Sequence, residues 1–68
     1  MKREKLVEYR GNRSQAVMAK MYGVSQQCWC KWENGENKPS VVLMKKMEMD
    51  SGMPMEVLFF DIFNKKNL

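Results

Sequence analysis

Apolar residues recur at helical spacing along the first part of the chain, and short polar breaks separate the runs. Residues 2–10 carry Leu6 and Tyr9 three positions apart, which predicts a charged amphipathic helix with these two side chains inward. Gly11 and Asn12 follow, and both residue types tolerate the left-handed backbone conformation that ends helices. The first predicted element is therefore a short helix that ends at about residue 10.

The stretch 14–35 predicts two short helices joined by a tight turn. Ser14 is placed to cap a helix over about residues 15–22, and Gly23 breaks it. Ser25 is placed to cap a second helix that runs to about residue 34 and is stopped by Gly35. Because Ser and Gly at these positions favour helix starts and stops, the boundaries follow from local chemistry alone.

The second of these helices has a polar face and an aromatic face. At 100° per residue, Gln27, Lys31 and Asn34 fall within about 60° of one another. Trp29 and Trp32 fall on the opposite side. A solvated surface helix is also amphipathic, but this polar face has no acidic residue before the last turn, and its amides can pair bidentately with adenine. The pattern favours a helix that contacts the edges of DNA bases.

A fourth predicted helix starts at Pro39 and Ser40 and is ended by Gly52. Its expected inward residues are Val41, Met44, Met47 and Ser51. Eight methionines in the chain could line an adaptable binding groove, but most lie at core spacing and are expected to fill the core.

The last predicted helix opens at Pro54 and carries apolar side chains around most of its circumference. One side can pack on the core, and the rest would form an exposed patch unless it is paired. Residues 54–63 are therefore the expected dimerisation region, with packing inside the monomer as the alternative. The expected contact residues are Phe59, Phe60, Ile62 and Phe63. The polar tail, residues 64–68, is expected to be frayed.

Length and composition restrict the class of protein. Sixty-eight residues, 44% of them hydrophobic, make a single globular domain near the lower size limit, where dimerisation would add burial. No apolar run approaches the roughly 18 residues of a membrane span. The start, MKREKLVEYR, lacks the apolar core of a signal peptide. We expect a single domain over residues 1–68 that is cytoplasmic.

The net charge of +4 is unevenly distributed. Residues 1–13 hold five basic and two acidic side chains, residues 14–35 hold two and one, and residues 36–68 hold five and five. The net charges of the three segments are therefore +3, +1 and 0, and the positive excess lies in the first half of the chain. Such an asymmetry fits an anionic partner on one face, although many small proteins are mildly basic.

The chemical inventory argues against catalysis and metal binding. The chain has no histidine, and its two cysteines, Cys28 and Cys30, would point roughly 160° apart on a helix. They can neither share one metal ion nor bridge each other, so reduced thiols are expected. Without a nucleophile–base set or a phosphate-binding glycine loop, we expect no enzyme activity and no cofactor.

A series of residues at fixed spacings resembles the phage repressor and Cro (XRE-like) family of helix-turn-helix DNA-binding proteins. The resemblance covers about residues 6–59. It is carried by Arg10, Ser14-Gln15, Met18-Ala19, Gly23-Val24-Ser25, Trp29, Trp32-Glu33-Asn34-Gly35, Pro39 and Leu58-Phe59. It implies an all-α, compact bundle of about five short helices whose third helix enters the major groove of DNA.

The resemblance also implies roles for individual residues. Those in base-facing positions are Gln26, Gln27, Cys28 and Lys31. Those in phosphate-facing positions are Gln15, Asn34, Lys38 and Arg13. Arg10 and Glu33 match a structural ion pair, and Gln15 also braces the recognition helix. The turn 11–13 is shorter than in lambda-like members, which leaves the role of Arg13 open.

Two positions depart from the family pattern. Glu48 and Ser51 stand where small or apolar residues are usual, so the core there is expected to be looser, or Glu48 to find a partner across a dimer. The expected function is homodimeric, sequence-specific binding to a palindromic DNA operator by a small bacterial or phage-encoded transcriptional repressor. The alternative is a protein-interaction module, such as an antitoxin or an antirepressor partner, with the same fold.

Overall fold

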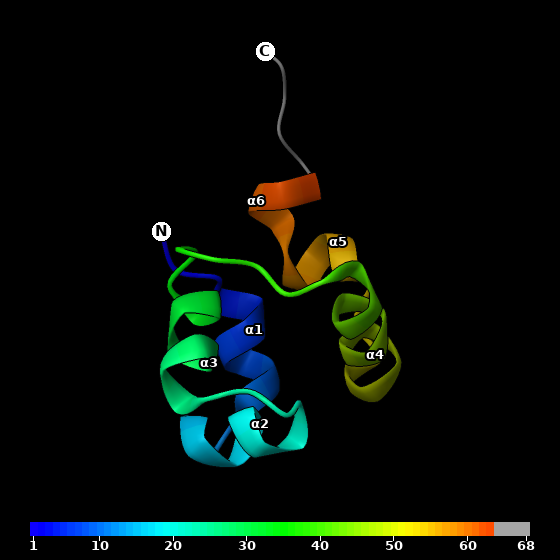
Figure 1. Cartoon of the computed structure of the whole chain (residues 1–68). Helices are drawn as coiled ribbons and strands as arrows, with labels where there is room; N and C mark the ends of the chain where they lie inside the picture. Colours follow the sequence, from blue (N-terminus) through cyan, green and yellow to red (C-terminus); the bar gives the residue numbers. More distant parts are fainter. Residues whose placement is uncertain (64–68) are drawn as a thin grey trace.

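The computed structural model describes residues 1–63, which form six short helices and, within that range, no strand. The helices are α1 (Glu4–Arg10), α2 (Gln15–Met21), α3 (Gln26–Glu33), α4 (Val41–Ser51), α5 (Met55–Leu58) and α6 (Phe60–Phe63). Helices α1 to α3 form one side of the molecule, α4 and α5 the other, and α6 lies at the same end as the N-terminus (Figure 1). The predicted all-α bundle is confirmed. The prediction of a frayed tail concerns residues 64–68, which lie outside the described residues.

Three serine caps start the longer helices where the sequence predicts. The side-chain oxygens of Ser14, Ser25 and Ser40 each accept a hydrogen bond from the backbone N–H three residues later. The three distances are 3.1, 3.1 and 3.2 Å. Each cap satisfies one of the N–H groups that have no partner within the helix, so these starts are fixed locally.

The core lies between the two sides and is built around the aromatic face of α3. Trp29 stacks on Tyr22 and meets Trp32 edge-on, with ring centroids 5.6 Å apart in both pairs. Other helices add apolar side chains around these rings. The buried hydrophobic residues are Leu6, Met18, Ala19, Tyr22, Trp29, Trp32, Met44, Met47, Leu58 and Phe59.

The prediction that Val41 of α4 is a core residue is wrong. Met44 and Met47 are buried, but the side chain of Val41 is 67% exposed, and Leu43 packs against the core in its place. The buried face is centred between Met44 and Met47, and at 100° per residue Val41 lies about 90° from that centre. The pattern matched the spacing of Val41 but not the direction of the face.

The two residues that depart from the family pattern are explained within one chain. Glu48 pairs with Lys45 at 2.8 Å and accepts the backbone N–H of Met55 at 3.0 Å. The Ser51 hydroxyl accepts the N–H of Met53 at 3.0 Å. Both side chains therefore stabilise the turn between α4 and α5. Glu48 needs no partner across a dimer.

The single helix predicted after Pro54 is two short helices, and this corrects one expected contact residue. The backbone leaves helical geometry at Phe59 (φ −122°, ψ 53°), which ends α5 and directs the Phe59 ring into the core, where it is fully buried. Phe59 is thus unavailable for contact with another chain. Ile62 packs against the core, while Phe60 and Phe63 remain 59% and 43% exposed.

Neighbouring phenylalanines allow a matched test of this arrangement. We expect Phe59→Ala to lower the free energy of unfolding by about 3–5 kcal/mol, because it leaves a cavity in the core. Phe60→Ala should change it by less than about 1 kcal/mol, because most of that ring is in solvent. Urea denaturation of the two variants measures both values at low protein concentration. Equal losses would contradict the placement of Phe59.

Candidate nucleic-acid interface

The outer face of α3 presents three long polar side chains. Gln26, Gln27 and Lys31 are exposed, while Trp29 and Trp32 on the opposite face are buried. The predicted division into a polar and an aromatic face is confirmed. No hydrogen bond or ion pair within the described residues uses the side chains of these three residues, so their donors and acceptors face solvent.

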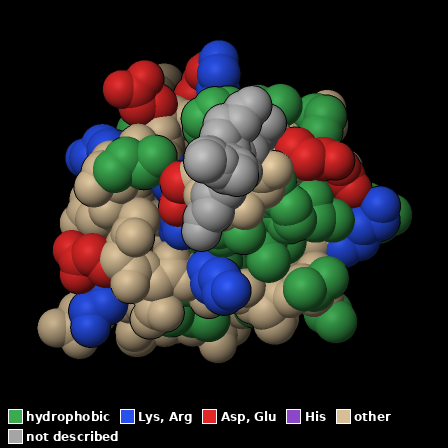
Figure 2. Space-filling view, turned by 90° about the horizontal axis from the view of Figure 1, so that it is seen from above, with side chains coloured by type: hydrophobic (Ala, Val, Ile, Leu, Met, Phe, Trp, Pro, Cys, Tyr) green, Lys and Arg blue, Asp and Glu red, His purple; other side chains and the backbone are tan. Residues whose placement is uncertain are grey.

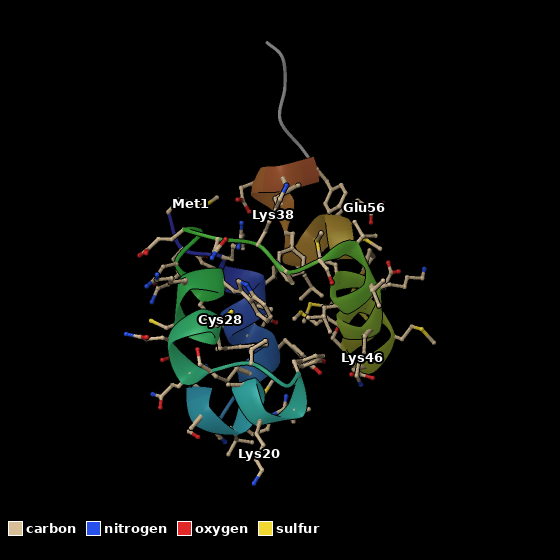
Figure 3. The ribbon with its side chains drawn as sticks, in the orientation of Figure 1. Met1, Lys20, Cys28, Lys38, Lys46 and Glu56 are labelled. Carbon is tan, nitrogen blue, oxygen red and sulfur yellow. The ribbon has the colours of Figure 1, made fainter. Side chains whose placement is uncertain are left out.

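The cysteines of α3 are less accessible than this face. Cys28 and Cys30 are free thiols and half-buried. Cys28, labelled on α3 in Figure 3, packs against the core, so only part of it joins the outer face. Cys30 Sγ lies 3.5 Å from Nδ2 of Asn34, which follows α3 as its C-cap.

The carboxylate of Glu33, at the end of α3, is buried and receives hydrogen bonds from three helices. Arg10 on α1 donates through Nε at 2.7 Å and through Nη2 at 3.3 Å. Gln15 Nε2 on α2 donates at 2.9 Å, and Trp29 Nε1 on α3 donates at 2.6 Å. The predicted Arg10–Glu33 ion pair and the bracing of α3 by Gln15 are therefore confirmed.

These contacts keep the Glu33 carboxylate ionised. Burial alone would raise the pKa of Glu33, but the hydrogen bonds from Arg10, Gln15 and Trp29 outweigh it and hold the pKa below its usual value. Glu33 is the only acidic residue from Tyr9 to Gly35. Since its side chain is 1% exposed and paired, this whole segment presents no carboxylate to solvent.

Two of the residues expected to bind phosphate already make hydrogen bonds within the chain. One amide N–H of Gln15 is used by Glu33. Arg13 donates from Nη2 to the carbonyl of Tyr9 at 2.7 Å and from Nε to the carbonyl of Arg10 at 3.1 Å. Its guanidinium therefore caps the C-terminal end of α1. Contact of either residue with phosphate remains a prediction that must use the remaining donors.

The segment after α3 carries the other two expected phosphate-binding residues. Asn34 is half-buried, whereas Lys38 is exposed and projects from the chain between α3 and α4 (Figure 3). Lys20 projects from α2 at the opposite end of the molecule. Lys20 and Lys38 thus lie at opposite ends of the molecule, with α3 between these ends.

Sequence reasoning missed Arg3, which is 5% exposed. Its Nε and Nη2 donate to the two carboxylate oxygens of Asp61 at 2.8 and 2.9 Å, and its Nη1 donates to the carbonyls of Trp32 and Asn37 at 2.7 and 2.6 Å. One signal was present in the sequence. Asp61 interrupts the apolar run VLFFDIF, and a carboxylate there needs a cationic partner.

A tyrosine pair, also missed, connects the α1–α3 side to α4. The hydroxyls of Tyr9 and Tyr22 are 2.7 Å apart, and the Tyr22 hydroxyl donates to Asp50 at 2.9 Å. Burial, together with the bonds to Tyr9 and Asp50, raises the pKa of Tyr22 far above its usual value. Tyr22 is therefore a neutral donor across the pH range of folded proteins, and its bond to Asp50 links α2 to α4.

Comparison of the chain with protein-family models, curated proteins and solved structures gives no match. Within residues 1–63, no group of three or more His, Cys, Asp and Glu side chains could hold a metal ion. None of the helices in this range is long and apolar enough to cross a membrane. The candidate interface therefore rests on the geometry of α2, α3 and the segment after them.

The buried Glu33 predicts a pH-dependent loss of stability. We expect Glu33→Gln to lower the free energy of unfolding at pH 7 by about 3 kcal/mol, because it leaves the half-buried Arg10 without its counter-charge. Since the folded-state pKa of Glu33 is below the unfolded value, its contribution is present above about pH 4.3 and is lost as the pH falls through the folded-state pKa. The gap between parent and variant should therefore close in acid.

Urea denaturation from pH 7 to pH 3 measures this gap. Glu8→Gln is the matched control, because it removes the same charge from an exposed pair with Lys5. It should cost less than about 1 kcal/mol. A gap between the parent and Glu33→Gln that stays constant down to pH 3 would refute the charged network.

Proposed function

We propose that this chain is a sequence-specific double-stranded DNA-binding protein that acts as a homodimer in the cytoplasm. In this proposal α2 and α3 form a helix-turn-helix unit, and α3 enters the major groove. The observation that carries the proposal is the surface of residues 9–35. It exposes amides and basic side chains and no carboxylate, because the single acid, Glu33, is buried. Such a surface can approach phosphate without like-charge repulsion.

The side chains on α3 suit contacts with base edges. A glutamine amide can donate to N7 and accept from N6–H of adenine, and a lysine can donate to O6 and N7 of guanine. Gln26, Gln27 and Lys31 are exposed and not used within the chain, so they can make these bonds without breaking others. Lys38 and the remaining donors of Gln15, Asn34 and Arg13 would position the protein on phosphates.

The proposed homodimer rests on the exposed aromatic side chains of α6. Phe60 and Phe63 are 59% and 43% exposed, an unfavourable state for two neighbouring rings in water. Pairing α6 with α6 of a second copy would cover them. A two-fold dimer would read half-sites about 34 Å apart, one turn of DNA, which implies a palindromic operator. Repression by covering a promoter follows from the family resemblance.

A protein-interaction module is the second candidate, and α4 supplies its specific observation. Val41, Val42 and Met49 are 67%, 78% and 75% exposed. With Met55 they line a shallow groove of about 590 Å³. Hydrophobic side chains also gather on the α4 and α5 side when the molecule is viewed from its α6 end (Figure 2). A protein partner could bind this groove while α3 remains free.

Selection of duplexes from a random pool tests the proposed function directly. We expect enrichment of a palindrome whose half-sites are centred about one helical turn apart. If unrelated sequences or no sequences are enriched, sequence-specific DNA binding is ruled out and the protein-interaction module is favoured. Purified protein at moderate salt is required, because high salt suppresses the phosphate contacts that all duplexes share.

On the selected duplex, Gln27→Ala should weaken binding by about 1–3 kcal/mol and relax base choice at one position of each half-site. Lys38→Ala is the matched comparison. It should weaken binding to the selected and the scrambled duplex equally. It should also reduce the magnitude of the slope of log K against log salt concentration by about one for each phosphate that is no longer bound. Fluorescence anisotropy across a salt series measures both effects. If Gln27→Ala binds both duplexes as the parent does, Gln27 does not read a base.

Replacement of Phe60 and Phe63 by serine should dissociate the proposed dimer, because it removes the exposed apolar rings that would be covered. Sedimentation velocity over a concentration series measures the dimer dissociation constant, which we expect to rise by at least about tenfold. Val42→Ser on α4 is the control and should leave it unchanged, since Val42 is 78% exposed on a different face. If Val42→Ser dissociates the dimer and the phenylalanine replacements do not, the dimer contact lies on α4 instead.

A further inference from the structure

We propose that Arg3 is a positioning residue that couples α6 to the loop of residues 34–38, and through this loop couples dimer formation to phosphate binding. This inference rests on the function proposed above. Arg3 lies in the chain segment before α1 and contacts two regions far away in sequence.

Arg3 divides its hydrogen bonds between these two regions. Two of its nitrogens bind both oxygens of Asp61 on α6 at 2.8 and 2.9 Å. Nη1 binds the carbonyl of Trp32, in the last turn of α3, and the carbonyl of Asn37 in the loop. Paired bonds of this kind fix the plane of a guanidinium, and only arginine has the geometry to make all of them. A shift of Asp61 therefore changes the position of the group that holds the loop.

The backbone around Arg3 strengthens the contact with the loop. The N–H of Arg3 donates to the carbonyl of Glu33 at 2.7 Å, and the amino group of Met1 lies 3.5 Å from the carbonyl of Asn34. Gly35 has a φ of +76°, and a Cβ there would collide with the carbonyl oxygen of Met1. The first residues of the chain thus pack directly on the loop that carries Asn34 and Lys38.

The position of α6 depends on the same side chain. A helix of four residues has no stability of its own, so tertiary contacts must hold it. Arg3 supplies one of them, the paired bond to Asp61, and its guanidinium also lies 5.3 Å from the centre of the ring of Phe59, the residue directly before α6. Asp61 lies between Phe60 and Phe63, the rings of the proposed dimer contact. Ordering of α6 in a dimer therefore orders Arg3, and Arg3 orders the loop.

Coupling between two sites is reciprocal, so phosphate binding at the loop must strengthen the dimer by the same factor. The two states are the bridged one, with Arg3 on both Asp61 and the loop carbonyls, and one in which α6 has left Arg3. In the second state, a buried guanidinium loses its counter-charge, which raises its free energy. A dimer contact and a phosphate both favour the bridged state.

Hydrogen exchange of the parent protein without DNA tests the first half of the coupling. The backbone N–H groups of Glu36 and Lys38 should exchange at least about threefold more slowly in the dimer than at concentrations where the chain is monomeric. The N–H of Val17, held by the Ser14 cap far from α6, is the reference and should not change. If the chain dimerises and the loop amides exchange as before, the coupling is refuted. If it does not dimerise, the coupling is refuted as well.

Asp61→Asn tests the second half, with Glu8→Gln as the control that adds the same net charge. Added positive charge alone should make both variants bind DNA slightly more tightly. The coupling predicts the opposite for Asp61→Asn: about tenfold weaker binding of monomers to a half-site duplex, the effect of one charge-assisted hydrogen bond. It also predicts a lower salt slope, which a general loss of stability would not change in folded protein. Arg3→Lys, which keeps the charge but not the paired geometry, should behave like Asp61→Asn.

The outcomes separate the two proposals. If Asp61→Asn weakens the dimer but matches Glu8→Gln in half-site affinity and salt slope, the coupling is wrong and the DNA-binding function stands. If the parent binds no duplex while its loop amides respond to dimerisation, the DNA-binding function is wrong and the link from α6 to the loop stands. Thermal melting confirms that each variant is folded, and the exchange experiment needs no variant.

Discussion

The buried carboxylate of Glu33 is the interaction on which the rest of the structure depends. A charge away from water is costly unless it is paired and hydrogen-bonded, and Glu33 has donors from Arg10, Gln15 and Trp29. Those donors come from three helices, so satisfying one charge fixes α1, α2 and α3 relative to one another. The same burial removes the only negative charge of residues 9–35 from the surface. Packing and surface charge therefore have a common cause.

A second buried charge, Arg3, connects segments that are far apart in the sequence. The two networks meet where the N–H of Arg3 donates to the carbonyl of Glu33. Glu33 orders the side built from α1 to α3, whereas Arg3 joins that side to the loop after α3 and to α6. A small core leaves little apolar area to hold short helices, so paired charges at the helix ends supply much of the orientation.

The features that the sequence predicted are those decided within a few residues. The caps Ser14 and Ser25 and the two faces of α3 depend on local chemistry and helical periodicity, and all of them are found. The features it missed depend on contacts between distant segments. Nothing within ten residues of Arg3 indicates that it will pair with Asp61, and nothing in the apolar run around Phe59 indicates that the helix breaks there and buries the ring. The Arg10–Glu33 pair was reached only through a family resemblance.

The outer face of α3 takes no part in the contacts that hold this helix in place. Gln26, Gln27 and Lys31 are exposed, and the networks of Glu33 and Arg3 do not use their side chains. Changes at exposed positions without partners usually alter stability by less than about 0.5 kcal/mol. The scaffold that holds α3 is therefore energetically separate from the side chains that α3 presents. Under the proposed function, the base preference could change at these three positions while the fold, and the coupling through Arg3, stay the same.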